Sequence, residues 1–305
     1  MADKREWKGS TGGGFLGQQA LIFFFRCWNL RTGYAVMAAV VPFYMLFARK
    51  GYISIYRYFR IQWGCSPLKS FLKTYRNHYL FGQMLLDRFA VYAGKKNKFE
   101  VEISGNEHFT RLSEGEKGFI IAGSHTGNFE LSGYLFHSGR KRMNVLTFAG
   151  ETGTIRKNRM KLMGKNNIRT IPVLSDMSHL FTVHAALRNG EIVNIPCDRF
   201  SGSGKSLRCR FLNGQTRFPT SAFTFAVRCD VEVLALFCMK VSAKKYRIFI
   251  RPVVALQKEN ADKRRKKEEL LTDAYVRELE KIVRQFPEQW FNYYEFWNEP
   301  PVFRE

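Results

Sequence analysis

Cysteine is scarce and unpatterned in this sequence. The six cysteines include no C-x-x-C pair, and none has a metal-like spacing with the six histidines. Neither a disulfide framework nor a metal site is therefore expected, and a reduced, cytosol-facing protein is the simpler interpretation. The sequence also lacks an internal repeat and a long linker, which argues against a solenoid or a chain of tethered modules.

Acidic residues are in short supply. There are 26 Asp and Glu against 49 Lys and Arg, which gives a formal net charge of +23. Such a basic surface favours an anionic partner: nucleic acid, an anionic bilayer surface, or an acidic carrier or substrate. The basic residues are spread along the chain without a zinc finger, an RNA-recognition signature or a basic zipper region. We therefore expect no nucleic-acid partner.

The first fifty residues contain two apolar segments. The segment at 15–25, FLGQQALIFFF, is followed by RCWNL, which offers no small-residue cleavage site, so we expect it to be retained. The segment at 32–48 has 17 uncharged residues, at the short end of what spans a bilayer. Together they predict a membrane-associated helical hairpin at the interface, with basic residues toward anionic lipid. A buried helix pair in a soluble protein is the alternative, and whether the segments cross the bilayer or lie along it stays open.

The remaining chain changes pattern once. Residues 51–94 are aromatic and basic with helical spacing, and they predict two helices joined near Cys65-Ser66-Pro67. After Lys95, short β-branched runs alternate with helical stretches, which predicts an α/β fold with a mixed, largely parallel sheet flanked by helices. Such sheets bind ligands at the carboxyl ends of their strands. The runs are FEVEISG, GFIIAGS, MNVLTFAG, IRTIPV, EIVNIPCD, VEVLALFCM and YRIFIRPVV.

An amphipathic helix is expected near the C-terminus. Its apolar face consists of Leu271, Tyr275, Leu279, Ile282, Val283 and Phe286, and the basic run at 263–267 precedes this face. The domain prediction is an N-terminal membrane-anchoring segment at 1–50 and an α/β domain at 51–305. The α/β domain contains the helical lead-in at 51–94 and a C-terminal part at 258–305.

The stretch GSHTGNFE places a histidine in a turn between a strand and a helix. If FIIAG is the strand and NFELSGYLF the helix, His125 lies at the carboxyl edge of the sheet and Glu130 in the first helical turns. A carboxylate that accepts from one ring nitrogen fixes the tautomer and leaves the other nitrogen free as a general base. The alternative is that Glu130 caps its helix and His125 is an ordinary turn residue.

Two other patterns predict no site. The run GSGKS, at 202–206, lacks the glycine that a phosphate-binding loop needs five positions before Gly204, because that position is Arg199. The other five histidines share no metal-binding spacing, so structural roles are expected for them.

Four segments carry a family resemblance. SHTGNFE resembles the H-x4-[DE] motif of the glycerolipid acyltransferase superfamily, and more narrowly the Gly-Asn-Trp-Glu form found in the lipid A late acyltransferases of Gram-negative bacteria. ALRNGEIVNIPCDR resembles a strand of that family that ends in Asp-Gln. FLNGQTRFPTSAFTFAVRCDVEVLALF and LEKIVRQFPEQWF resemble two later segments, the second being a P-x-Q-W box.

The resemblance implies an acyltransferase fold and a membrane-bound enzyme at the cytoplasmic face of the bacterial inner membrane. It implies transfer of a fatty acyl group from acyl carrier protein or acyl-CoA, as co-substrate and without a cofactor, to a hydroxyl of a membrane lipid, foremost a lipid A precursor. In that scheme His125 is the base and Glu130 its orienting carboxylate. Asn128 either holds the turn or donates to the oxyanion. Arg159, Asp198 and Arg199 match substrate-binding positions.

The chain also departs from the family pattern. Phe129 stands in place of the tryptophan, and Arg199 in place of the glutamine. After the P-x-Q-W box the family continues into a pair of arginines, whereas this chain has Glu295 and Phe296 at about that place. This difference keeps a second acceptor class open: an aminolipid, a lysophospholipid or a lipid-like pigment. A third hypothesis is a basic membrane-surface binding protein that has the acyltransferase fold without turnover.

Overall fold

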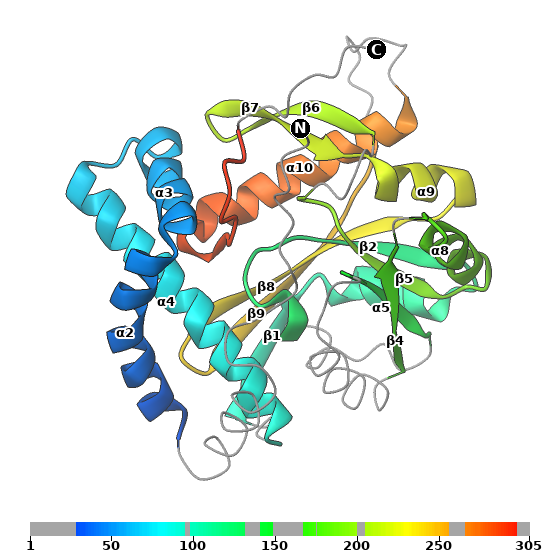
Figure 1. Ribbon diagram of the computed structural model, residues 1–305. Coiled ribbons are helices and arrows are strands. Elements are labelled where there is room, and N and C mark those ends of the chain that lie inside the picture. Colours follow the sequence, from blue (N-terminus) through cyan, green and yellow to red (C-terminus); the bar gives the residue numbers. More distant parts are fainter. Residues whose placement is uncertain are drawn as a thin grey trace.

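Seven strands form one mixed sheet at the centre of the molecule (Figure 1). The computed structural model describes residues 29–94, 98–131, 141–148, 167–174, 176–199, 205–255 and 266–297. The strand order is β1-β9-β8-β2-β5-β3-β4, and all neighbours are parallel except the β8–β9 hairpin. The strands are β1 (Glu100–Ser104), β2 (Phe119–Gly123), β3 (Met143–Phe148), β4 (Ile168–Val173), β5 (Ile192–Pro196), β8 (Val233–Ser242) and β9 (Lys245–Pro252).

The sequence prediction of this sheet is confirmed. Each of the seven β-branched runs supplies one strand. The central strand β2 is buried at every position, as expected for a parallel strand covered on both faces. Alternate β2 side chains enter two separate cores: Ile120 and Ala122 face one, and Phe119 and Ile121 face the other.

Helices cover both faces of the sheet. On one face, α8 (His179–Arg188), α9 (Ser221–Cys229) and α10 (Lys267–Gln285) pack against the strands. On the other face lie α2 (Leu30–Phe47), α4 (Pro67–Tyr92) and α5 (Asn106–Glu114). The predicted apolar face of α10 is buried from Leu271 to Val283, while Phe286 lies just past the end of the helix.

The lead-in contains the two helical parts that the sequence predicted. It forms α3 (Arg49–Arg57) with the π-helical turn η1 (Tyr58–Gln62), and then α4. Ser66 and Pro67 separate the two parts, as predicted. The side chain of Ser66 accepts a 3.4 Å hydrogen bond from the Lys69 backbone, and Pro67 occupies the first helical turn, where a missing N–H costs nothing.

One two-stranded element escaped the sequence prediction. Strands β6 (Ser206–Phe211) and β7 (Gly214–Pro219) form an antiparallel hairpin beside α10, at the top of Figure 1. Its two turn residues are Leu212 and Asn213, and Leu212 has a positive φ of 53°.

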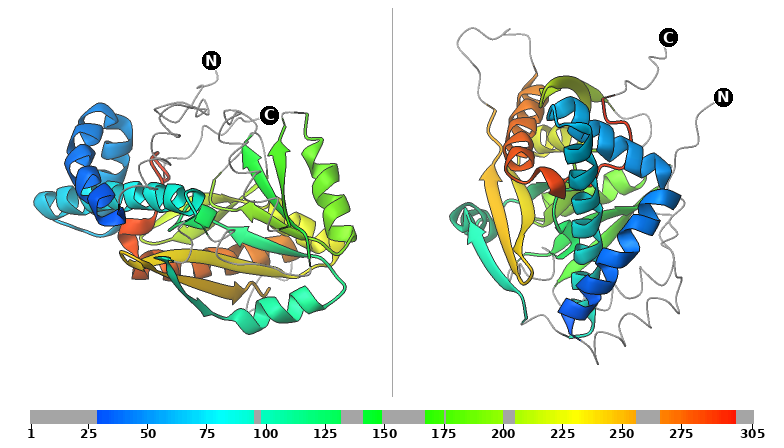
Figure 2. Two further views of the ribbon diagram at one scale, coloured as in Figure 1. Left: turned by 90° about the horizontal axis from the view of Figure 1, so that it is seen from below. Right: turned by 90° about the vertical axis from the view of Figure 1, so that its left-hand side faces the viewer.

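Helix α2 is the apolar segment predicted at 32–48, and it packs along α4. Figure 2 shows this helix lying across the side of the molecule in front of α4. The Tyr75 hydroxyl donates to the Ala38 carbonyl at 3.1 Å, and Gly82 leaves room for Met37, because a Cβ there would lie 2.6 Å from its sulfur. By length and composition α2 is the one described helix that could cross a membrane. The partner segment predicted at 15–25 lies outside the described residues.

Candidate active site

Two neighbouring strands end side by side and carry the candidate site. Strands β2 and β5 are parallel, and their last residues Gly123 and Pro196 are register partners. The Cys197 N–H extends this pairing to the Gly123 carbonyl at 2.9 Å. Two residues past these strand ends come His125 and Asp198, so the sheet itself brings the two side chains together.

His125 and Asp198 form a hydrogen-bonded pair. The imidazole Nδ1 lies 2.8 Å from Asp198 Oδ1, and the His125 backbone N–H donates to Oδ2 at 2.8 Å. A carboxylate accepts only, so Nδ1 carries the proton and Nε2 presents its lone pair. The Asp198 side chain is fully buried, whereas the imidazole is 22% exposed. This arrangement fixes the tautomer and leaves Nε2 able to accept a proton.

The charge state of Asp198 follows from its surroundings. Burial by itself would raise the pKa of this carboxyl, but the charge and hydrogen bonds of His125, together with the charge of Arg199, hold it below its ordinary value. The carboxylate therefore stays ionised through the neutral range. An ionised partner stabilises the imidazolium that forms when Nε2 takes a proton.

Glu130 has a different position from the one the sequence suggested. We expected its carboxylate to fold back toward the imidazole, but Asp198 occupies that place. The Glu130 carboxylate instead pairs with Arg88 of α4 at 2.5 Å. Local spacing could not reveal this, because Asp198 comes from another strand and Arg88 from a helix on one face of the sheet. A catalytic role for Glu130 stays a prediction.

Asn128 holds the turn. Its side-chain oxygen accepts a 3.2 Å hydrogen bond from the Leu131 N–H, which caps the helix that begins at Phe129. Its amide nitrogen donates to the Met84 carbonyl at 3.3 Å and to the Tyr246 hydroxyl at 3.2 Å. With both amide hydrogens used, Asn128 fits the first of its two expected roles, and the oxyanion role stays a prediction.

The histidine loop, residues 124–128 between β2 and the next helix, is held on both sides by backbone pairing. From β8, the Cys238 carbonyl accepts from the Asn128 N–H at 2.7 Å. From the P-x-Q-W box, the Gln289 carbonyl accepts from the Gly127 N–H at 2.8 Å, and Phe291 donates to the His125 carbonyl at 3.0 Å. Gly127 has a positive φ of 55°, and a Cβ there would lie 2.1 Å from the Cys238 carbonyl oxygen. Glycine is therefore required at this position.

The P-x-Q-W box thus supports the loop through its glutamine and tryptophan. The Gln289 side chain pairs with the backbone of Lys240 in both directions, at 2.9 and 2.7 Å, and acts as an added partner for β8. Trp290 is 1% exposed and packs edge-on against Tyr58 and Phe211. The box therefore holds the histidine loop and the neighbouring strand β8 in place.

Comparisons with known proteins identify the family of this chain. Residues 75–298 match the family described as bacterial lipid A biosynthesis acyltransferase. The chain belongs to that family. A search of curated proteins finds no match. Among solved structures, the chain is similar to the 1-acyl-sn-glycerophosphate (LPA) acyltransferase PlsC from Thermotoga maritima, with 14% identity and a TM-score of 0.36, covering 82% of this chain and 99% of that chain.

Of the two arginines assigned from the family pattern, the structure describes Arg199 but not Arg159. Arg199 donates to the Phe291 carbonyl at 2.7 Å, and its guanidinium lies 5.8 Å from the centre of the Tyr294 ring. It therefore ties the β5 end to the C-terminal segment. Arg159 lies outside the described residues, so its substrate-binding role stays a prediction, as does that of Arg199 and of Asp198.

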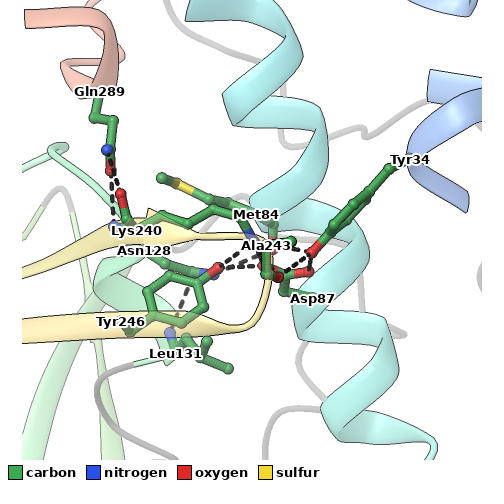
Figure 3. A network of polar contacts seen from close by, with 9 residues as sticks. All are labelled: Tyr34, Met84, Asp87, Asn128, Leu131, Lys240, Ala243, Tyr246 and Gln289. Atoms are coloured by element: carbon green, nitrogen blue, oxygen red, sulfur yellow. Dashed lines mark hydrogen bonds and ion pairs between the residues drawn. The ribbon is translucent and has the colours of Figure 1, made fainter. Parts of the chain in front are cut away.

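A buried polar network behind the loop was missed at the sequence level. Lys240 of β8 and Asp87 of α4 form an ion pair with side chains 2% and 0% exposed, and the hydroxyls of Tyr34 and Tyr246 bond to both (Figure 3). Tyr246 also accepts from Asn128, so the network reaches the loop. Its sequence signal is weak: a lysine in the apolar run of β8, and an aspartate beside Arg88 on a largely apolar stretch of α4.

The described residues contain no group of three or more His, Cys, Asp or Glu side chains that could hold a metal ion.

Proposed function

We propose that this acyltransferase moves a fatty acyl group from an acyl carrier protein thioester, or acyl-CoA, to a hydroxyl of a membrane lipid, with His125 as general base. A lipid A precursor is the first candidate acceptor, as the family membership suggests. The observation that carries the proposal is the His125–Asp198 pair, with Nε2 free at the carboxyl edge of a parallel sheet.

The proposed step is direct transfer. Nε2 takes the proton of the acceptor hydroxyl while that oxygen attacks the thioester carbonyl. The new C–O bond forms, the C–S bond breaks, and the thiolate leaves and receives the proton from the imidazolium. The activated thioester makes an enzyme nucleophile unnecessary, so a histidine paired to a carboxylate is sufficient for this step.

The positive charge of the chain suits the proposed donor. A net charge of +23 attracts the acidic acyl carrier protein and an anionic bilayer, and it raises encounter rates with both at low salt. A carrier in the cytosol and an acceptor in the membrane would meet at the cytoplasmic face of the bacterial inner membrane.

Helix α2 is proposed to lie in the membrane interface rather than to cross it. One side of the helix packs on α4 through Met37 and Ala38. The other side exposes large apolar side chains, including Phe43 at 64% and Phe47 at 87%. A helix with one face on its own domain and one apolar face outward suits an in-plane position. Further exposed apolar residues on the helical layer are Ile61, Leu68, Phe71 and Leu72.

Placing aspartates at Phe43 and Phe47 together is expected to lower partitioning onto anionic vesicles by at least tenfold, because about 1.5–3 kcal/mol is lost for each phenylalanine kept out of lipid. Vesicle flotation measures this. Phe181→Asp, at an equally exposed phenylalanine on α8 (82%), serves as the control and should leave partitioning unchanged. Equal flotation of all three proteins would contradict the interfacial position.

A second acceptor class is favoured by one observation. Glu295, which follows the P-x-Q-W box, pairs with Arg57 of α3 at 3.0 Å. An ion pair at this place is a poor match for a doubly phosphorylated acceptor and a better one for an aminolipid or a lysophospholipid. The substrate type would then differ while the transfer chemistry stays the same.

The test is purified enzyme assayed with an acyl carrier protein thioester against lipid A precursors and lysolipids in parallel, with free thiol and product mass as readouts. We expect one acceptor class to release thiol and to gain one acyl chain. If neither the precursors nor the lysolipids cause thiol release, the proposal is contradicted. That outcome would favour a binding protein without turnover.

A further inference from the structure

A cleft with aromatic walls and a few polar side chains lies between the helical lead-in and the C-terminal segment. Arg57 and Ile61 line it from α3 and η1, and Asn292, Tyr294 and Glu295 line it from the other side. The Tyr294 hydroxyl donates to the Asp198 backbone carbonyl at 3.5 Å. The cleft therefore adjoins the strand end that carries the catalytic pair.

The lining of the cleft includes a buried amide. Asn292 is 3% exposed, and its side chain interacts with Tyr294, which also lines the cleft, but no described residue pairs with its oxygen or nitrogen in ordinary hydrogen-bond geometry. A buried amide without partners is unfavourable, and such groups are rare in folded proteins. A ligand that offers both a donor and an acceptor would satisfy it.

The charged residues of the cleft are one cation and one anion. The Arg57 guanidinium and the Glu295 carboxylate lie 3.0 Å apart, with side chains 57% and 30% exposed, and they are the charged side chains among the described lining residues. An exposed pair of this kind is weak, so a ligand can exchange it at low cost. A zwitterion offers each partner a new counter-ion, whereas a dianion leaves the carboxylate repelled.

We infer that this cleft binds the headgroup of the acceptor lipid, and that the headgroup is zwitterionic, with an anionic group on Arg57 and an ammonium on Glu295. Asn292 then pairs with the polar atoms between the two charges. Ile61, 66% exposed at the same cleft, meets the apolar part of the lipid. The inference rests on the proposed function and selects the second acceptor class.

Acyl transfer to two matched acceptors tests the charge preference. The probes are lysophosphatidylethanolamine, which is zwitterionic, and lysophosphatidylglycerol, which is anionic, with the same acyl chain. Wild type is expected to prefer the zwitterion in kcat/KM. Glu295→Arg should lower that preference ratio at least about tenfold. The change is expected mainly in KM, because an arginine at this position repels the ammonium that the carboxylate attracted.

The control is a matched ion pair away from the cleft. Glu280 pairs with Arg284 on α10 at 2.7 Å, so Glu280→Arg makes the same charge change without touching the cleft. The inference is overturned if Glu295→Arg leaves the ratio within twofold of wild type, or if Glu280→Arg changes it equally.

A binding measurement separates this inference from the proposed function. In His125→Asn protein, which cannot use the proposed base, calorimetry with glycerophosphoethanolamine and glycerophosphoglycerol reports headgroup binding alone. Tighter binding of the zwitterion that is lost in a His125→Asn, Glu295→Arg double variant supports the cleft even if transfer fails. Equal binding of both probes contradicts the assignment of the cleft as a headgroup site, even if transfer succeeds.

Discussion

Without the imidazole of His125, acyl transfer is expected to fall by about 10²–10⁴ in kcat, the usual contribution of a positioned general base. His125→Ala and His125→Asn should both show this loss. The asparagine amide can still donate to Asp198, so the second variant removes the base while keeping the buried carboxylate paired. Thiol release from an acyl carrier protein thioester, with acceptor present, measures the rate.

The control is His184→Gln, at an exposed histidine on α8. It should retain full activity, and all three variants should unfold with wild-type cooperativity. A rate for His125→Asn within fivefold of wild type would remove this residue from the mechanism.

Asp198→Asn tests the partner of the base. The amide of this variant can donate to Nδ1, and the ring proton then moves to Nε2. A protonated Nε2 cannot accept the proton of the acceptor hydroxyl. We expect a loss of about 10²–10⁴ in kcat with little change in KM. A Glu130→Gln variant makes the matching comparison, since its carboxylate lies on Arg88 rather than on the imidazole. If only Glu130→Gln were inactive, the assignment of the orienting carboxylate would be reversed.

The second large effect is expected at the buried pair of Lys240 and Asp87. Burial raises the pKa of the aspartate and lowers that of the lysine, even though each favours the charged form of the other. Lys240→Met leaves a carboxylate in the core without its cation, and losing one partner of such a pair costs about 3–5 kcal/mol of unfolding free energy. Denaturant unfolding in mild detergent measures it.

The comparison for this prediction is an exposed pair. Arg111 and Glu232 lie 2.7 Å apart with side chains 57% and 56% exposed, so Arg111→Met should cost far less unfolding free energy than Lys240→Met. A Lys240→Met, Asp87→Asn double variant should recover part of the loss, because the stranded charge is gone. Equal costs at the two pairs would contradict the assigned role of the network.

The sequence predicted the sheet well because β-branched runs and their turns are local signals. The same signals located His125 at a strand end. They could not select its partner, because Asp198 meets the imidazole only through the pairing of β2 with β5, and local spacing favoured Glu130 instead. The Lys240–Asp87 pair was missed for the same reason: it joins a strand and a helix that meet only in the folded chain. The β6–β7 hairpin was missed for another reason: its turn residues are Leu212 and Asn213, and a leucine at a turn position with positive φ is not a recognised hairpin signal.

The support of the histidine loop by the P-x-Q-W box has a consequence for synthesis. The loop is made long before Gln289 and Phe291, which supply two of its backbone hydrogen bonds. At translation rates of ~5–20 residues per second, the roughly 160 residues between them take about 8–30 s. During that time the nascent chain has its base but not the segment that fixes the loop around it. Acyl transfer would therefore begin only after almost the whole described fold has left the ribosome.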